Sequence, residues 1–97
     1  MKYNFEWDAV KARINMNKHG ISFEQAVDVF KDPMALTIFD DENSIDKEDR
    51  WITLGLSNDQ HYLVVVHTYR IQQNETVTIR LISARLATKH EIKQYQG

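Results

Sequence analysis

Polar and apolar positions near the N-terminus indicate a short strand followed by a helix. Residues 3–6 form a candidate β-strand, and Asp8 is a suitable N-cap for a helix over residues 9–18. Gly20 is predicted to end this helix, because a glycine just past a helix C-terminus adopts the left-handed conformation at little cost. We therefore expect a strand and a helix in this opening segment.

A one-sided apolar pattern indicates a second helix directly after the first. Ser22 and Gln25 have the spacing of a capping box, in which each side chain binds the backbone N–H of the other residue. Apolar side chains then recur at positions i, i+3, i+4 and i+7, namely Phe23, Ala26, Val27 and Phe30. We expect this helix to end near Lys31, because Pro33 disfavours helical backbone at the residue before it.

After Pro33 the pattern changes to extended runs separated by polar segments. The predicted strands cover residues 34–39, 50–56, 61–69 and 76–83. The third run has a continuously apolar centre, which is typical of a strand covered on both faces, so we expect it in the middle of the sheet. Thr88 and Glu91 then have capping-box spacing for a short helix that reaches about Tyr95.

The grouping of these elements predicts an α+β domain with an antiparallel sheet. We expect about four strands plus the short N-terminal strand, with two N-terminal helices and a short C-terminal helix. At 97 residues, a single domain over residues 1–97 is long enough for one core that needs neither metal nor disulfide.

Composition and charge narrow the class of protein. The chain has no cysteine, which excludes disulfide scaffolds and thiolate metal sites and favours a reducing cytoplasm. No apolar run reaches the ~18 residues of a membrane span, and charges near the N-terminus argue against a signal peptide. The net charge of -2 conceals an imbalance, because residues 50–97 hold six basic and three acidic residues. The second half therefore carries the cations available to bind phosphate.

The acidic segment at residues 40–49 is predicted to be an exposed loop. Asp41 and Asn43 have the spacing of the first two ligands of a calcium-binding loop. However, Asp46 occupies the position where that loop needs glycine, and Ile52 occupies the position where it needs glutamate. We therefore expect no bound metal here and no cofactor.

Several short motifs occur in one order along nearly the whole chain. They are F-E-W-D at residues 5–8, K-H-G at 18–20, S-F-E at 22–24, D-P at 32–33, R-W at 50–51, Gly55, V-V-H-T at 65–68, I-R-L-I-S-A-R at 79–85, A-T at 87–88, Glu91 and Tyr95. This order resembles the BrnT family, the toxin half of a bacterial type II toxin–antitoxin pair. The resemblance implies a RelE-like fold, a ribonuclease activity that stops translation, and neutralisation by a BrnA-like antitoxin. That antitoxin carries a ribbon-helix-helix region, so a hetero-oligomer of the two is expected to contact operator DNA only through the antitoxin.

Cleavage of RNA without a metal needs a proton acceptor, cations that stabilise the charged phosphorane, and a group that protonates the leaving oxygen. His67 is the histidine inside the predicted central strand, and imidazole titrates near neutral pH. We therefore favour His67 for proton transfer. A hydrogen-bonded histidine in the sheet core is an equally good interpretation of the same residue.

Arg50, Arg80 and Arg85 are the candidate cations, because arginine stays charged and presents a planar fork to phosphate. Arg80 and Arg85 have opposite parity along one predicted strand. They share a face only if the strand bulges or ends between them, near Ser83 and Ala84. Solvated strand arginines are the alternative interpretation.

Further candidates lie on the helices. Tyr95 is a candidate for base stacking or proton transfer, or it packs the C-terminal helix on the sheet. Lys18 and His19 are candidate RNA contacts, or they stabilise the C-terminal end of their helix. Trp7 and Trp51 are interpreted as core residues.

Together these residues predict a metal-independent endoribonuclease in which one sheet face presents Arg50, His67, Arg80 and Arg85 to RNA, with Tyr95 in support. Two other functions stay open. One is a toxin of the same fold that binds a protein target such as a topoisomerase, and the other is an interaction module without enzymatic activity.

Overall fold

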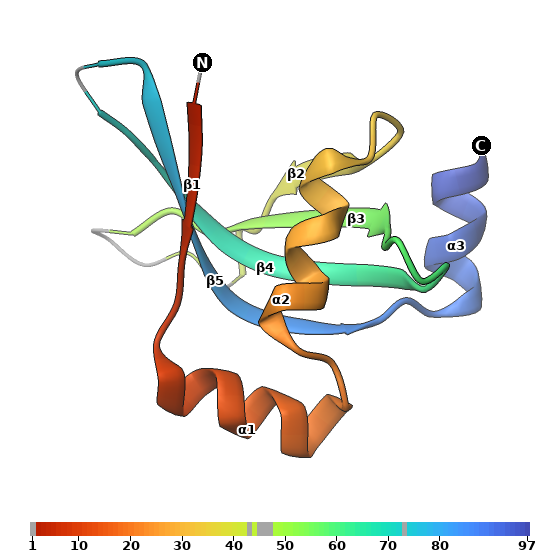
Figure 1. The fold of residues 1–97 in the computed structure, drawn as a ribbon. Coiled ribbons are helices and arrows are strands. Elements are labelled where there is room, and N and C mark those ends of the chain that lie inside the picture. Colours follow the sequence, from red (N-terminus) through yellow and green to blue (C-terminus); the bar gives the residue numbers. More distant parts are fainter. Residues whose placement is uncertain (1, 43, 45–47, 73) are drawn as a thin grey trace.

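The computed structural model describes residues 2–42, 44, 48–72 and 74–97. In chain order, its elements are β1 (Lys2–Glu6), α1 (Ala9–His19), α2 (Phe23–Ala26), the 3-10 helix η1 (Val27–Lys31), β2 (Leu36–Phe39), β3 (Trp51–Leu56), β4 (Tyr62–Ile71), β5 (Thr76–Leu86) and α3 (Lys89–Gln96). The strands of this described part form one sheet in the order β1-β5-β4-β3-β2, so β4 is central as predicted (Figure 1). Neighbouring strands are antiparallel except for β1 and β5, which are parallel. None of the described helices is long and apolar enough to cross a membrane.

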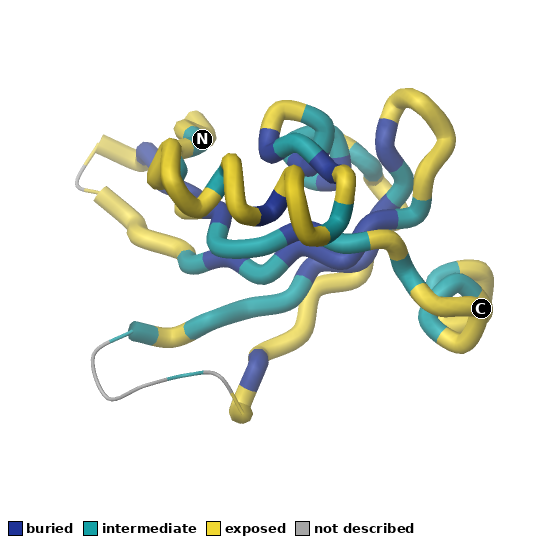
Figure 2. The backbone as a smooth tube through the Cα atoms, turned by 90° about the horizontal axis from the view of Figure 1, so that it is seen from below, coloured by how far each residue is buried: buried dark blue, intermediate teal, exposed yellow. Residues whose placement is uncertain are grey.

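The N-terminal helices α1, α2 and η1 pack against one side of the sheet, which we call the helix face (Figure 1). The buried side chains that β4 and β5 contribute to it are Leu63, Val65, His67, Val77, Ile79, Leu81 and Ala84. The alternate residues of the same strands form the opposite side, which we call the open face. At one end of the open face, Glu91 and Gln94 of α3 border Leu54 and Val64. Burial is therefore deepest along the middle of the sheet, and the outer side of α1 is exposed (Figure 2).

Both ends of α1 follow the sequence prediction. The Asp8 carboxylate accepts a hydrogen bond from the Val10 N–H at 2.8 Å. Gly20 ends the helix with a φ of 70°, in the left-handed region that glycine tolerates. These two caps set where α1 begins after β1 and where it ends before α2.

The second helix departs from the prediction in two ways. Ser22 Oγ accepts a hydrogen bond from the Gln25 N–H at 3.0 Å, but the Gln25 side chain donates to Asp59 at 2.8 Å, so the capping box is only half formed. After α2 the backbone tightens into η1. A repeat of three residues per turn stacks Ala26 and Val29, both fully buried, one above the other against the sheet.

Strand β5 contains a β-bulge at Ile82, because the residues on either side of it pair with consecutive residues of β4. The extra residue brings Arg80 and Arg85 to the same open face, as the prediction required, one residue earlier than expected. Just beyond the bulge, the buried Asn15 side chain of α1 exchanges two hydrogen bonds with the Ala84 backbone, at 2.9 and 3.0 Å. Helix α1 therefore fixes the strand where its register shifts.

The ends of the acidic segment are anchored. Asp40 is only 6% exposed, and its N–H donates to the Arg50 carbonyl at 2.9 Å. The Ser44 hydroxyl donates to the Asp40 carbonyl at 2.7 Å and accepts from the Arg50 N–H at 3.0 Å. The expected exposed loop is therefore found at Asp41, Glu42 and Asp49, whereas Asp40 is buried. Residues 43 and 45–47 lie outside the described part of the chain, and they include Asn43 and Asp46 of the calcium-loop pattern.

Candidate active site

His67 lies in the core of the protein, on the helix face of β4. Its side chain is fully buried, and its Nε2 lies 2.7 Å from the Thr53 hydroxyl. Its ring makes edge-to-face contacts with Phe30 and Tyr69, with centroids 4.8 and 4.9 Å apart. Burial lowers the pKa of His67 to about 4 against a smaller opposing effect of the Thr68 backbone, and Nδ1 has no partner of ordinary hydrogen-bond geometry among the described residues.

This environment corrects the expectation that His67 is presented to RNA beside the arginines. The imidazole is neutral at pH 7, because desolvation disfavours its charged form. Since successive side chains of a strand point to opposite faces, His67 is directed away from the open face that bears Arg80. The alternative interpretation, a hydrogen-bonded core histidine, describes the geometry.

Two arginines do share a hollow on the open face. Arg80 pairs in register with Thr68, and Arg70 pairs with Thr78, so the two arginines are diagonal neighbours on adjacent strands. They border a polar hollow of about 380 Å³, which we call the arginine pocket. Its lining residues are Glu6, Glu48, Asp49, Thr68, Tyr69, Arg70, Thr78 and Arg80.

Carboxylates accompany the cations in the arginine pocket. Arg70 Nη2 lies 3.8 Å from Glu6 Oε1, and Glu6 is the register partner of Arg80 across the parallel β1–β5 pair. Arg50 is not a lining residue, but its Nε lies 3.4 Å from Oε1 of Glu48, which lines the pocket. Guanidinium groups can hold a phosphate here, and a carboxylate beside them can accept a proton.

Arg85 has a different partner and a different place. It binds Glu91 through two nitrogens at 2.8 and 2.9 Å, which lowers the pKa of Glu91 to about 2 and raises that of Arg85. Arg80 pairs with Thr68 and Arg85 with Val64, so roughly 13 Å of strand separates the two arginines. The expected convergence of Arg80 and Arg85 does not occur, and Arg85 instead ties β5 to α3.

Tyr95 also anchors α3. Its hydroxyl donates to Asp32 Oδ2 at 2.7 Å, and its ring packs edge-to-face on Tyr62 with centroids 5.3 Å apart. The bond to Asp32 is the largest cause that raises the pKa of Tyr95 to about 12. Tyr95 therefore matches the packing interpretation and lies outside the arginine pocket.

Lys18 and His19 lie at the C-terminal end of α1, where they line a separate hollow with Ser83. The candidates from the sequence are thus distributed over several places, and Arg80 is the one that lines the arginine pocket. Among the described residues, no group of three or more His, Asp or Glu side chains is placed to hold a metal ion.

The sequence interpretation missed Arg70 and Glu6. Counting by twos from His67 shows that Arg70 belongs to the other face of β4, and this is the signal that was available. No sequence signal placed Glu6 there, because its position depends on the parallel pairing of β1 with β5.

Comparison with known protein families identifies the family of this chain. The sequence profile of the family described as "Ribonuclease toxin, BrnT, of type II toxin-antitoxin system" matches residues 7–91. The chain belongs to the BrnT family. Its members are ribonuclease toxins of type II toxin–antitoxin systems, so RNA as the target and an antitoxin as the partner follow from membership.

A solved structure supports the fold of this BrnT family member. The crystal structure of the Brucella abortus ribonuclease toxin BrnT superposes with a TM-score of 0.62 at 20% sequence identity. The match covers 92% of this chain and 100% of the Brucella chain. At this identity the similarity establishes the shared fold, which confirms the predicted α+β class. Among curated protein sequences, none matches the chain.

Proposed function

We propose that this BrnT family member cleaves RNA at the arginine pocket, without a metal ion. The observation that carries the proposal is that Arg70 and Arg80 are diagonal neighbours on one exposed face, with Glu6 3.8 Å from Arg70 and in register with Arg80. Two guanidiniums offer parallel hydrogen bonds to a phosphate and stay charged at any physiological pH. They supply the positive charge that the transition state requires.

The proposed step uses the 2′-hydroxyl of the RNA itself. Glu6 accepts the proton of the 2′-hydroxyl, the 2′-oxygen attacks phosphorus, and the bond from phosphorus to the 5′-oxygen breaks. The 5′-oxygen takes a proton from a water molecule, and the hydroxide that remains takes up the proton held by Glu6, which restores the carboxylate. The products are a 2′,3′-cyclic phosphate and a 5′-hydroxyl, and Arg70 and Arg80 stabilise the phosphorane between them.

The proposed partner is a BrnA-like antitoxin that carries a ribbon-helix-helix region. The family description supports an antitoxin, and the pocket suggests how it acts. An antitoxin that places carboxylates against Arg70 and Arg80 would block the phosphate site. We propose a cytoplasmic hetero-oligomer in which the antitoxin alone contacts operator DNA.

Cleavage of a single-stranded RNA in the presence of EDTA tests this proposal. We expect the wild-type protein to give cyclic-phosphate ends, and Arg70→Ala, Arg80→Ala and Glu6→Gln each to lower the rate, by about 10²-fold for an arginine. Arg13→Ala, on the exposed side of α1, is the matched control and should cleave normally. Cleavage that stops in EDTA would refute metal independence, and RNA that stays intact throughout would favour the protein-binding alternative.

A further inference from the structure

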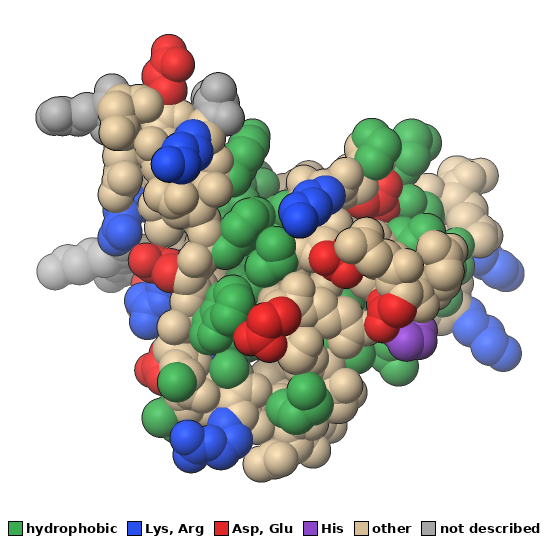
Figure 3. Space-filling view, viewed as in Figure 1, with side chains coloured by type: hydrophobic (Ala, Val, Ile, Leu, Met, Phe, Trp, Pro, Cys, Tyr) green, Lys and Arg blue, Asp and Glu red, His purple; other side chains and the backbone are tan. Residues whose placement is uncertain are grey.

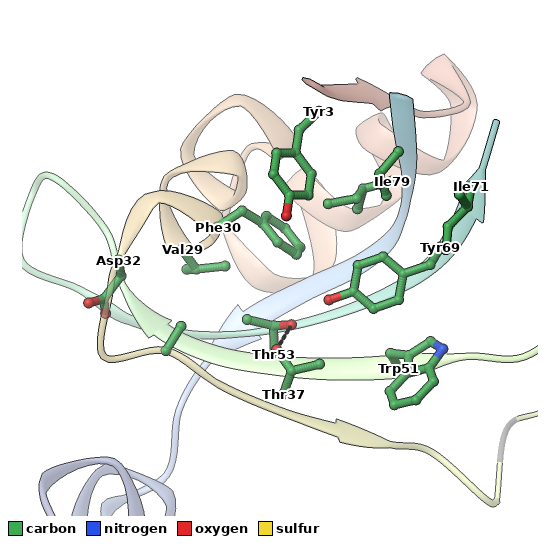
Figure 4. A pocket seen from close by; sticks show the side chains of 12 residues that line it. Tyr3, Val29, Phe30, Asp32, Thr37, Trp51, Thr53, Tyr69, Ile71 and Ile79 are labelled. Atoms are coloured by element: carbon green, nitrogen blue, oxygen red, sulfur yellow. Dashed lines mark hydrogen bonds between the residues drawn. The ribbon is translucent and has the colours of Figure 1, made fainter. Parts of the chain in front are cut away.

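A second hollow, of about 490 Å³, lies on the helix face between η1 and the sheet. Hydrophobic side chains gather in it (Figure 3). Tyr3, Phe30, Trp51 and Tyr69 supply its aromatic rings, and Thr37 and Thr53 lie on the sheet side, as Figure 4 shows. We call this hollow the aromatic groove.

We propose that the aromatic groove receives an unpaired base of the RNA whose backbone lies in the arginine pocket. This inference rests on the proposed function and names a contact that would select the nucleotide beside the cleaved bond. Three features of the groove carry it, and they concern its rings, its hydroxyl groups and its continuity with the arginine pocket.

The first feature is a set of partly exposed aromatic rings, of which Trp51 and Tyr69 are held by contacts with other rings. Tyr3 is 54% exposed and Tyr69 39% exposed, although both rings lie on the apolar side of a folded sheet. Trp51 packs edge-to-face between Phe39 and Tyr69, with centroids 5.2 and 5.7 Å apart. Rings fixed by such contacts lose little freedom when a base stacks on them, and every base offers a flat surface for stacking.

The second feature is a chain of hydroxyl groups at the sheet side of the groove. His67 Nε2 lies 2.7 Å from Thr53 Oγ1, which lies 2.8 Å from Thr37 Oγ1. A hydroxyl can donate one hydrogen bond and accept two, so Thr37, at the end of the chain, retains capacity for a further polar group. The edge of a nucleobase carries such groups, whereas an apolar side chain does not.

The third feature is continuity with the proposed cleavage site. Tyr69 lines both the aromatic groove and the arginine pocket. The next residue, Arg70, points to the open face, and the pairing of β3 with β4 begins only at Trp51 and His67, so this end of β4 projects beyond β3. An RNA strand that crosses this end can place its phosphate at Arg70 and a neighbouring base at Tyr69.

Fluorescence of Trp51 tests the groove without any cleavage. Trp7→Phe leaves Trp51 as the single tryptophan, and Trp51→Phe leaves Trp7, which is partly buried and packs against the core at Phe23. The probe is a short 2′-O-methyl oligoribonucleotide, which lacks the attacking hydroxyl. We expect it to quench Trp51 saturably and to leave Trp7 unchanged, and we expect Tyr69→Leu to weaken its binding about tenfold, within the range for loss of one stacking ring.

An abasic oligonucleotide of the same length is the matched control ligand. We expect it to bind more weakly than the base-containing probe and to leave Trp51 emission unchanged. Equal binding of the abasic and base-containing oligonucleotides would overturn the proposal. It would favour an apolar side chain of the antitoxin as the occupant of the groove. A wrong cleavage site can be distinguished from a wrong base-binding site. If only the proposed cleavage site is wrong, Arg80→Ala will still cleave RNA, and quenching of Trp51 will still depend on the bases of the probe.

Discussion

Acidification is expected to destabilise the folded protein through His67. Burial lowers the pKa of this imidazole from its ordinary value of 6.5 to about 4. The unfolded chain takes up a proton at His67 as the pH falls through about 6.5, whereas the folded chain does so only near 4. The contribution of the neutral imidazole is therefore fully present above pH 6.5 and is lost progressively as the pH falls toward 4.

The magnitude follows from the width of that interval. Each pH unit between the two pKa values lowers the free energy of unfolding by ~1.36 kcal/mol, so acidification from about pH 7 to about pH 5 removes roughly 2 kcal/mol. Globular proteins have total stabilities of only about 5–15 kcal/mol. The pKa values of Asp32, Asp59 and Glu91 are lowered instead, so their contributions are lost mainly below this interval.

Urea unfolding followed by circular dichroism at these two pH values measures the effect. His67→Leu removes the titrating group, keeps an apolar side chain in the core and leaves Thr53 bonded to Thr37. The drop in the free energy of unfolding should be roughly 2 kcal/mol larger in the wild type than in this variant. An equal drop in both proteins would refute the claim that a neutral, buried His67 is part of the fold.

Two further substitutions test the packing that positions β5 and β3. Asn15→Ala should lower the free energy of unfolding by about 3 kcal/mol in urea denaturation, because it removes three hydrogen bonds, to Ile21 and Ala84, and leaves buried backbone groups unpaired. Asn17→Ala, on the exposed side of the same helix, is its control, and equal losses would contradict the buried role of Asn15. Gly55→Ala should lower the melting temperature, with a loss of about 1–3 kcal/mol, because its Cβ would lie 2.9 Å from that of Val29. A melting temperature equal to that of the wild type would show that η1 can move away from β3.

The order of elements was predictable because local signals mark each boundary. Asp8 and Gly20 fix the ends of α1 through their own side-chain and backbone chemistry. The Thr88–Glu91 capping box also forms as its spacing predicts, with bonds of 2.8 and 3.2 Å. Such signals act within a few residues, so they can be recognised in the sequence without knowing how the strands pair.

The assignment of residues to sheet faces was not predictable from local signals. Residues 63–66 are apolar at every position, so both faces of β4 look alike and the side that carries His67 is undetermined. The bulge at Ile82 has no glycine or proline to mark it, yet it decides that Arg80 and Arg85 share a face. The proposed cleavage site depends on which face of β4 carries Arg70 and on the parallel pairing of β1 with β5, which brings Glu6 to Arg80.

The most direct test of the proposed cleavage site compares substitutions on the two faces of the sheet. Initial rates of RNA cleavage are measured for the wild type, Arg80→Ala and His67→Leu, each shown to be folded by circular dichroism. We expect Arg80→Ala to cleave about 10²-fold more slowly and His67→Leu to cleave at close to the wild-type rate. Normal cleavage by Arg80→Ala together with loss of cleavage by His67→Leu would contradict a catalytic site on the open face.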